Sequence, residues 1–219
     1  MNTQQNFVRT LLLTLYLVIF LTPGFVFFSS RGGLDFLQVT DFQTFSRQIF
    51  PLFGLYAFTL VWFQFIIGTN LPHLVKYFRS IRNFHKKEGI FTLLFALTHP
   101  TLLIVGVGFE EYLGYKFLDP SLRIYAYFGT FALFLLILTA GAGFLEKWPP
   151  LKNHWRKVHY LNYLVFWLIW VHSWNLGSDV QGSLSYLWYF YGITAAASSI
   201  VRLWRAFPKT QTQTAQNSG

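Results

Sequence analysis

The stretch HYLNYLVFWLIWVH, residues 159–172, carries a histidine at each end of an otherwise uncharged, apolar run. Twelve residues separate the two histidines, and none of the twelve is charged. Such a run is typical of a membrane helix, where ionisable side chains are rare and usually functional. We therefore expect the two imidazoles to have a role inside a membrane.

The composition of the whole chain also indicates a membrane protein. Of its 219 residues, 53% are hydrophobic and only 11% are charged, whereas a soluble domain carries about 25% charged residues. The net charge of +9 is expected to set topology and to bind anionic lipid rather than nucleic acid. The chain has no cysteine, which excludes disulfides and thiolate-bound iron–sulfur clusters.

Six uncharged stretches are long enough to cross a hydrocarbon core, which takes about 20 residues of helix. They are residues 10–28, 48–71, 89–109, 124–145, 158–178 and 180–201. We expect the first to be retained as a helix, because FVFFSSRGG at 25–33 offers no small-x-small cleavage site. The prediction is an all-α membrane protein, a bundle of six transmembrane helices.

The basic residues predict the orientation of these six helices. With a cytoplasmic N-terminus, 13 of the 17 lysines and arginines lie on the cytoplasmic side and four on the other. The positive-inside rule therefore predicts that both termini are cytoplasmic. We expect an integral, multi-pass protein of a bacterial inner membrane.

Four of the six histidines form two pairs with similar spacing. His85 and His99 are 14 residues apart on the third segment, and His159 and His172 are 13 apart on the fifth. Each gap corresponds to about 20 Å along a helix, so the rings form an inner and an outer level. Two histidines facing each other across a bundle can bind one haem iron from both sides. The spacing predicts two stacked b haems between the third and fifth helices.

The ligand on the inner side of the fifth helix has a rival. At about 100° per residue, 13 residues do not return to the same face of a helix. His154, 18 residues before His172, shares its face but lies about 27 Å away, at the level of the headgroups. We favour His159, with His154 as the alternative, and interpret His73 as a solvated loop residue. Structural histidines that hydrogen-bond neighbouring helices are the alternative to haem ligation.

Basic side chains near the histidines are candidate partners for haem propionates. The positive-inside rule alone explains any one of those at the inner level equally well. The candidates are Arg82, Lys86, Arg156 and Lys157 at the inner level and Arg123 at the outer level. Phe95 and Phe166 lie on the ligand helices between the two levels, and Pro100 follows His99 directly. We expect the proline to loosen the helix there and to help aim the ring.

With its four histidines, the chain resembles the ferric reductase-like transmembrane domain family, the haem core of NADPH oxidases and metalloreductases. The resemblance covers residues 48–204 and rests on HKKEGIFTLLFALTH (85–99) and HYLNYLVFWLIWVH (159–172). It implies six helices and two b haems, held by histidine pairs on the third and fifth helices. Residues 1–47 would then form the first helix and an outer loop, and 205–219 a disordered tail.

In size the chain resembles a short bacterial branch of this family, typified by the haem-binding membrane subunit of the methionine sulfoxide reductase system. The matching residues are Gly89, His99, Trp155, His159, Tyr163, His172 and Trp174. His85 departs from the branch, which commonly has another basic residue there. This histidine completes the set of four, and in this respect the chain is more similar to the oxidase and ferric reductase core.

The expected function is transmembrane electron transfer, with no catalytic residue assigned. The sequence has no G-x-G-x-x-G after a strand, so we expect electrons to come from a separate flavin reductase, a bound flavin such as FMN, or a quinol. GAG at 141–143 is interpreted as a close-packing site. The acceptor on the outer side would be ferric iron, dioxygen, a quinone or a redox partner enzyme. The alternative is a haem-free scaffold or proton path that uses the membrane histidines.

Overall fold

The structure, a computed structural model, describes residues 3–39 and 41–206, and every regular element in that part is helical. The long helices are α1 (Thr3–Ser29), α2 (Phe42–Leu74), α3 (Ile81–Val107), α5 (Arg123–Phe144), α7 (Asn162–Leu176) and α9 (Ser185–Ala206). The short ones are η1 (Asp35–Leu37), α4 (Phe109–Tyr112), η2 (Leu113–Tyr115), α6 (Trp155–His159) and α8 (Ser178–Gln181). Most of the predicted tail, residues 207–219, lies outside the described residues.

Four of the described helices, α1, α2, α3 and α5, are long and apolar enough to cross a membrane. The prediction of an all-helical protein is therefore confirmed, and these helices are compatible with an integral membrane protein. The other two predicted spans correspond to α7 and α9. With 15 residues, α7 is about 22 Å long, less than a hydrocarbon core of about 30 Å.

The fifth predicted segment, 158–178, is not one continuous helix. Its first residues belong to α6, which ends at His159, and α7 starts at Asn162 and ends before Gly177. Between them, Tyr160 and Leu161 form a tighter turn with right-handed helical dihedral angles, in which the Leu161 amide donates to the Val158 carbonyl. This break separates His159 from the helix that carries His172, so the two rings need not follow the phase of a single helix.

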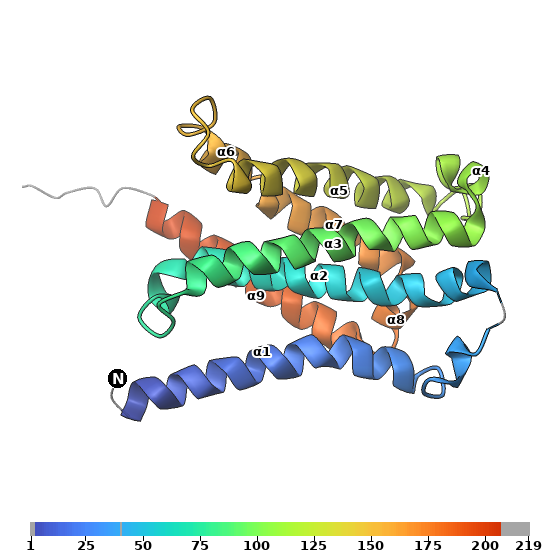
Figure 1. Ribbon diagram of the computed structural model, residues 1–219, viewed down its shortest axis with the longest axis horizontal. Coiled ribbons are helices and arrows are strands. Elements are labelled where there is room, and N and C mark those ends of the chain that lie inside the picture. Colours follow the sequence, from blue (N-terminus) through green and yellow to red (C-terminus); the bar gives the residue numbers. More distant parts are fainter. Residues whose placement is uncertain (1–2, 40, 207–219) are drawn as a thin grey trace, which may run out of the picture.

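The helices run roughly side by side, and α2 has a central position (Figure 1). It contacts α1, α3, α7 and α9, while α5 packs against α7 and α3. Asp41 caps the N-terminus of α2, because its side chain accepts a hydrogen bond of 2.8 Å from the amide of Thr44. Both ends of the described chain lie at the same end of the bundle (Figure 1).

We call the end of the bundle that holds both chain ends the basic end. It also contains residues 75–80 and 145–161, in which most charged side chains are cations. The opposite end, formed by residues 30–39, 108–122 and 177–184, is called the acidic end. There Arg31 binds both carboxylate oxygens of Asp179 at 2.9 Å and thereby ties the end of α1 to α8.

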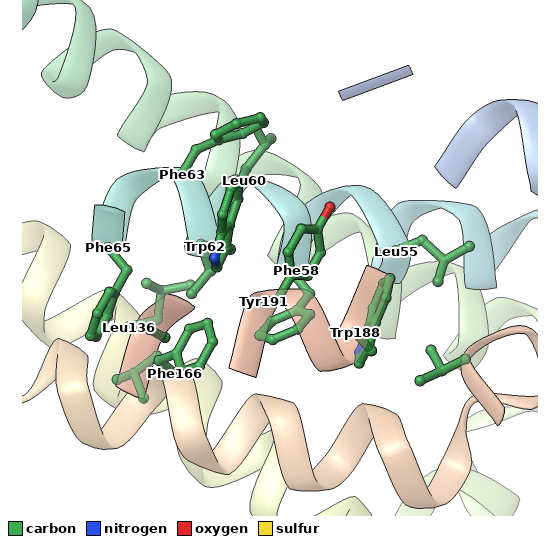
Figure 2. Close-up of a cluster of buried hydrophobic side chains, with 14 of the residues drawn as sticks. Leu55, Phe58, Leu60, Trp62, Phe63, Phe65, Leu136, Phe166, Trp188 and Tyr191 are labelled. Carbon is green, nitrogen blue, oxygen red and sulfur yellow. The ribbon is translucent and has the colours of Figure 1, made fainter. Parts of the chain in front are cut away.

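Aromatic side chains fill the centre of the bundle (Figure 2). Phe58 of α2 lies 5.2 Å from Phe166 of α7 and 5.3 Å from Trp188 of α9, measured between ring centres. Trp62 stacks on Tyr191 at 4.6 Å, and the Trp62 indole donates to Thr194. Close packing and satisfied polar atoms hold helices together where lipid removes the hydrophobic driving force.

Candidate functional site: two histidine pairs between the helices

The histidine pair nearer the acidic end consists of His99 on α3 and His172 on α7. Both rings line one cavity of about 280 Å³, close to the lower limit of ligand pockets, which span roughly 300–1,000 Å³. Most of the lining is apolar, as with Leu103, Leu133 and Ile169. The two histidines that the sequence places at one level therefore share a single apolar space.

Hydrogen bonds to a neighbouring helix orient both rings of this pair. His99 Nδ1 lies 2.9 Å from the carbonyl oxygen of Phe50, and His172 Nδ1 lies 2.8 Å from that of Tyr125. A carbonyl can only accept, so each Nδ1 carries the proton and donates it. Each Nε2 then keeps its lone pair, and neither has a protein partner among the described residues. This is the tautomer that binds iron through Nε2.

Each of these two rings packs directly against a glycine of the neighbouring helix. A Cβ atom on Gly54 of α2 would lie 2.8 Å from the ring of His99, and one on Gly129 of α5 would lie 2.5 Å from the ring of His172. Distances this short do not occur between real side chains, so any larger residue would displace the imidazole. The absence of a side chain at Gly54 and Gly129 therefore leaves the space that each imidazole ring occupies.

The pair nearer the basic end consists of His85 on α3 and His159 at the end of α6. Their ring centres are 6.4 Å apart, and the ring planes are 83° apart. Two metal–imidazole bonds of about 2 Å each, plus the distance from nitrogen to ring centre, require about 6 Å. The separation therefore suits two axial ligands on one iron.

This second pair is held more loosely than the first. His159 Nδ1 lies 3.3 Å from the carbonyl oxygen of Thr139 and 3.3 Å from the side-chain amide of Asn162. His85 Nδ1 is buried without a hydrogen-bond partner among the described residues. Glycines again face the rings: Gly68 faces His85 at 3.5 Å and Gly143 faces His159 at 3.7 Å, from the position of an added Cβ.

The four glycines form a pattern that the sequence analysis missed. Gly54 and Gly68 are 14 residues apart on α2, and Gly129 and Gly143 are 14 apart on α5. Each pair lies on the helix that packs antiparallel against a histidine-bearing helix. The signal in the sequence is this repeated spacing. GAG at 141–143 shows only part of it, because Gly143 faces His159 while a Cβ on Gly141 would meet open space.

The other two histidines lie away from these pairs. His154 is exposed just before α6, whereas the ring of His159 faces His85; the geometry thus favours His159. His73, interpreted as a loop residue, is exposed but lies in the last turn of α2. That helix extends beyond the predicted 48–71 because Pro72 does not end it.

The candidate propionate partners occupy varied positions. Arg82 is exposed on the first turn of α3, and Lys157 is exposed on α6. Arg156 lies over the Trp155 ring at 5.5 Å and lines a separate polar pocket with Lys147 and Lys152. Arg123 donates to the carbonyl of Leu118 at 3.3 Å and is not part of the cavity lining. Their role with propionates stays a prediction.

Lys86 pairs with a carboxylate. Its ammonium group lies 2.6 Å from Glu146, and this hydrogen bond lowers the pKa of the Glu146 carboxyl below its ordinary value. The side chains of Lys86 and Glu146 remain partly exposed, so the pair contributes little to stability. It joins the start of α3 to the loop after α5.

The aromatic residues predicted between the two levels have different environments. Phe166 is fully buried at the centre of the bundle, between Phe58 and Phe65. Phe95 is only partly buried and packs on Phe53 and Tyr56 of α2. Helix α3 continues through Pro100 to Val107.

In the described part of the chain, no three His, Asp or Glu side chains gather into a group that could hold a bare metal ion. The histidines instead form pairs, which is the number of axial ligands that a haem iron can take from a protein. Comparisons of the chain with models of known protein families, with curated proteins and with solved structures found no match.

Proposed function

We propose that this chain is a transmembrane b-type cytochrome with two haems, one at each histidine pair, related to the ferric reductase-like family. One observation carries the proposal: the histidines are paired between helices, and each ring lies against a glycine. His85 and His159 face each other with ring centres 6.4 Å apart, and His99 and His172 line one apolar cavity. In this proposal α7 and α9 complete a bundle of six spans. The basic end faces the cytoplasm, in line with the positive-inside rule.

The residues present fit a haem by their donor chemistry. In the pair near the acidic end, Nδ1 donation to a carbonyl fixes the tautomer and makes Nε2 a better ligand. The glycines leave the backbone bare where the rings lie, and the apolar cavity lining suits a porphyrin, which is apolar over most of its surface. When bound, the haems would supply one-electron transfer, and the four histidines would hold them.

Residues around the histidines would orient the rings, exclude water and supply charge for the haem propionates. The carbonyls of Phe50 and Tyr125 orient the rings, and the buried Phe58 and Phe166 keep water out of the space between the two levels. Arg82 and Arg156, with Lys86 and Lys157, supply positive charge for propionates at the basic end. Arg123 would do so at the acidic end after releasing the Leu118 carbonyl.

The proposed partners follow from this direction of transfer. Membrane lipid surrounds the apolar helices. The cations of the basic end attract an acidic flavin reductase or a flavin phosphate such as that of FMN, and a quinol within the membrane is the other donor class. A redox partner at the acidic end would accept the electrons.

A haem-free role is the second candidate. The bonds from His99 to Phe50 and from His172 to Tyr125 each link two helices, as structural histidines do in membrane bundles. A proton path along the same rings also fits this observation. Neither role requires the rings to occur as facing pairs against glycines.

The absorption spectrum separates these candidates. We expect the purified protein to show a Soret band and split α-bands after dithionite reduction, and no reduction by NADH alone. Adding a flavin reductase should allow reduction, at a rate that falls as salt rises, because the basic end steers the donor. A protein that shows no Soret band after expression with ample haem would contradict the proposal.

A further inference from the structure

Glu88 is a buried carboxyl group on α3, one residue before the apolar segment 89–109, and the site described above does not use it. It is 4% exposed and lies seven residues into the helix, about 10 Å from its start. A carboxyl group buried in this way is costly to ionise unless other groups compensate its charge.

Neutral groups from two other helices hold this carboxyl. The hydroxyl of Tyr16 on α1 donates to Oε1 at 2.8 Å, and the side-chain amide of Gln64 on α2 donates to Oε2 at 2.7 Å. The two ion pairs among the described residues, Arg31–Asp179 and Lys86–Glu146, do not include Glu88. A buried carboxylate that has no lysine or arginine partner needs another positive charge nearby to stay ionised. Without such a charge it binds a proton.

Gln64 connects this carboxyl to the histidine pair at the basic end. The same amide nitrogen that donates to Glu88 also donates to the carbonyl oxygen of His85 at 2.9 Å. Glu88 follows His85 by three residues, so the two lie on neighbouring turns of α3. A change of charge at this histidine pair therefore acts on Glu88 across one helical turn.

The groups that face Glu88 are few. From α1 it meets Tyr16, from α2 the neutral Gln64, and along α3 it has His85, with His159 opposite that ring. None of these is a lysine or arginine. No cation among these contacts would therefore offset a change of charge at the histidine pair.

We propose that Glu88 takes up one proton when the basic-end haem of the proposed cytochrome is reduced, and releases it on reoxidation. This rests on the proposed function. A reduced flavin or a quinol would supply one electron, and a haem held by His85 and His159 would then lose one positive charge. The Glu88 carboxylate then binds one proton from water at the basic end, so that electron and proton charges balance inside the bundle.

The test is a redox titration of the purified, haem-loaded protein. Across a pH series from about 5 to 9, the potential of one haem should fall with a slope of up to tenfold per pH unit in the equilibrium constant, or about 59 mV for one electron. Glu88→Gln should remove this slope and leave the other haem unchanged. Glu88→Asp should retain it, and Glu146→Gln, a matched change at a partly exposed carboxylate, should not affect it.

A second readout does not depend on replacing Glu88. The reduced-minus-oxidised infrared spectrum of the unmodified protein should gain a carboxylic acid band that shifts in D2O and changes in Tyr16→Phe. An unchanged slope in Glu88→Gln, or no carboxylic acid band in the unmodified protein, would overturn the role of Glu88. In either case a haem-containing protein leaves the proposed function intact, whereas a protein without haem removes that function itself.

Discussion

Each of the four histidines lies against a glycine of a neighbouring long helix, α2 for His85 and His99 and α5 for His159 and His172. At the acidic end the approach is closest, since an added Cβ on Gly129 would be 2.5 Å from the ring of His172. The imidazole cannot keep both this position and its bond to the Tyr125 carbonyl if the glycine acquires a side chain. The ring positions thus depend on the glycines as well as on the histidines.

We predict that Gly129→Ala removes most of the acidic-end haem and lowers stability by about 1–3 kcal/mol through overpacking. Haem content per protein and thermal unfolding would be measured together. Gly141→Ala is the matched control on the same helix, because its Cβ would meet nothing within 4 Å. Equal haem content in the two variants would contradict the proposal that Gly129 leaves the space for the His172 ring.

The histidines could be predicted from the sequence, but their glycine partners could not. Imidazoles in an apolar run stand out because ionisable groups there are rare. A glycine is common in membrane helices, and its role depends on which helix packs beside it. Gln64 and Glu88 were missed for the same reason, since their link to His85 exists only once α2 and α3 are in contact.

At the scale of the helix, the break between α6 and α7 explains the unequal histidine spacing. Asn162 starts α7, and its side chain lies 3.3 Å from His159 Nδ1 while it accepts a hydrogen bond of 2.6 Å from the Thr139 hydroxyl. These contacts connect the break to α5. The sequence predicted the apolar segment 158–178 and left a distortion between His159 and His172 open, because composition does not show where a backbone turns.

We predict that Asn162→Leu weakens haem binding at the basic end about ten- to a hundredfold, the usual cost of losing a group that orients a ligand. The acidic-end haem should remain. Haem retention during dilution, followed by the Soret band, measures this loss. Asn175→Leu on the same helix is the control, because its amide bonds to the carbonyl of Val171. A similar loss in both variants would indicate general destabilisation of α7.

For the whole molecule, the basic end carries most of the lysines and arginines, and both described chain ends lie there. We predict that a reporter active only when exported stays silent when fused after Gly219. The same reporter inserted after Asp119 at the acidic end should be active. The reverse result would place the acidic end in the cytoplasm and exchange the donor and acceptor sides.

The number of haems per chain, and the histidines on which each depends, tests the central claim most directly. Pyridine haemochrome analysis of the purified protein should give two b haems. His99→Ala and His172→Ala should each leave one, and so should the double variant, because both residues serve the same haem. His85→Ala and His159→Ala should each leave the other. A chain that binds no haem, or that keeps both haems without His85, would contradict the account.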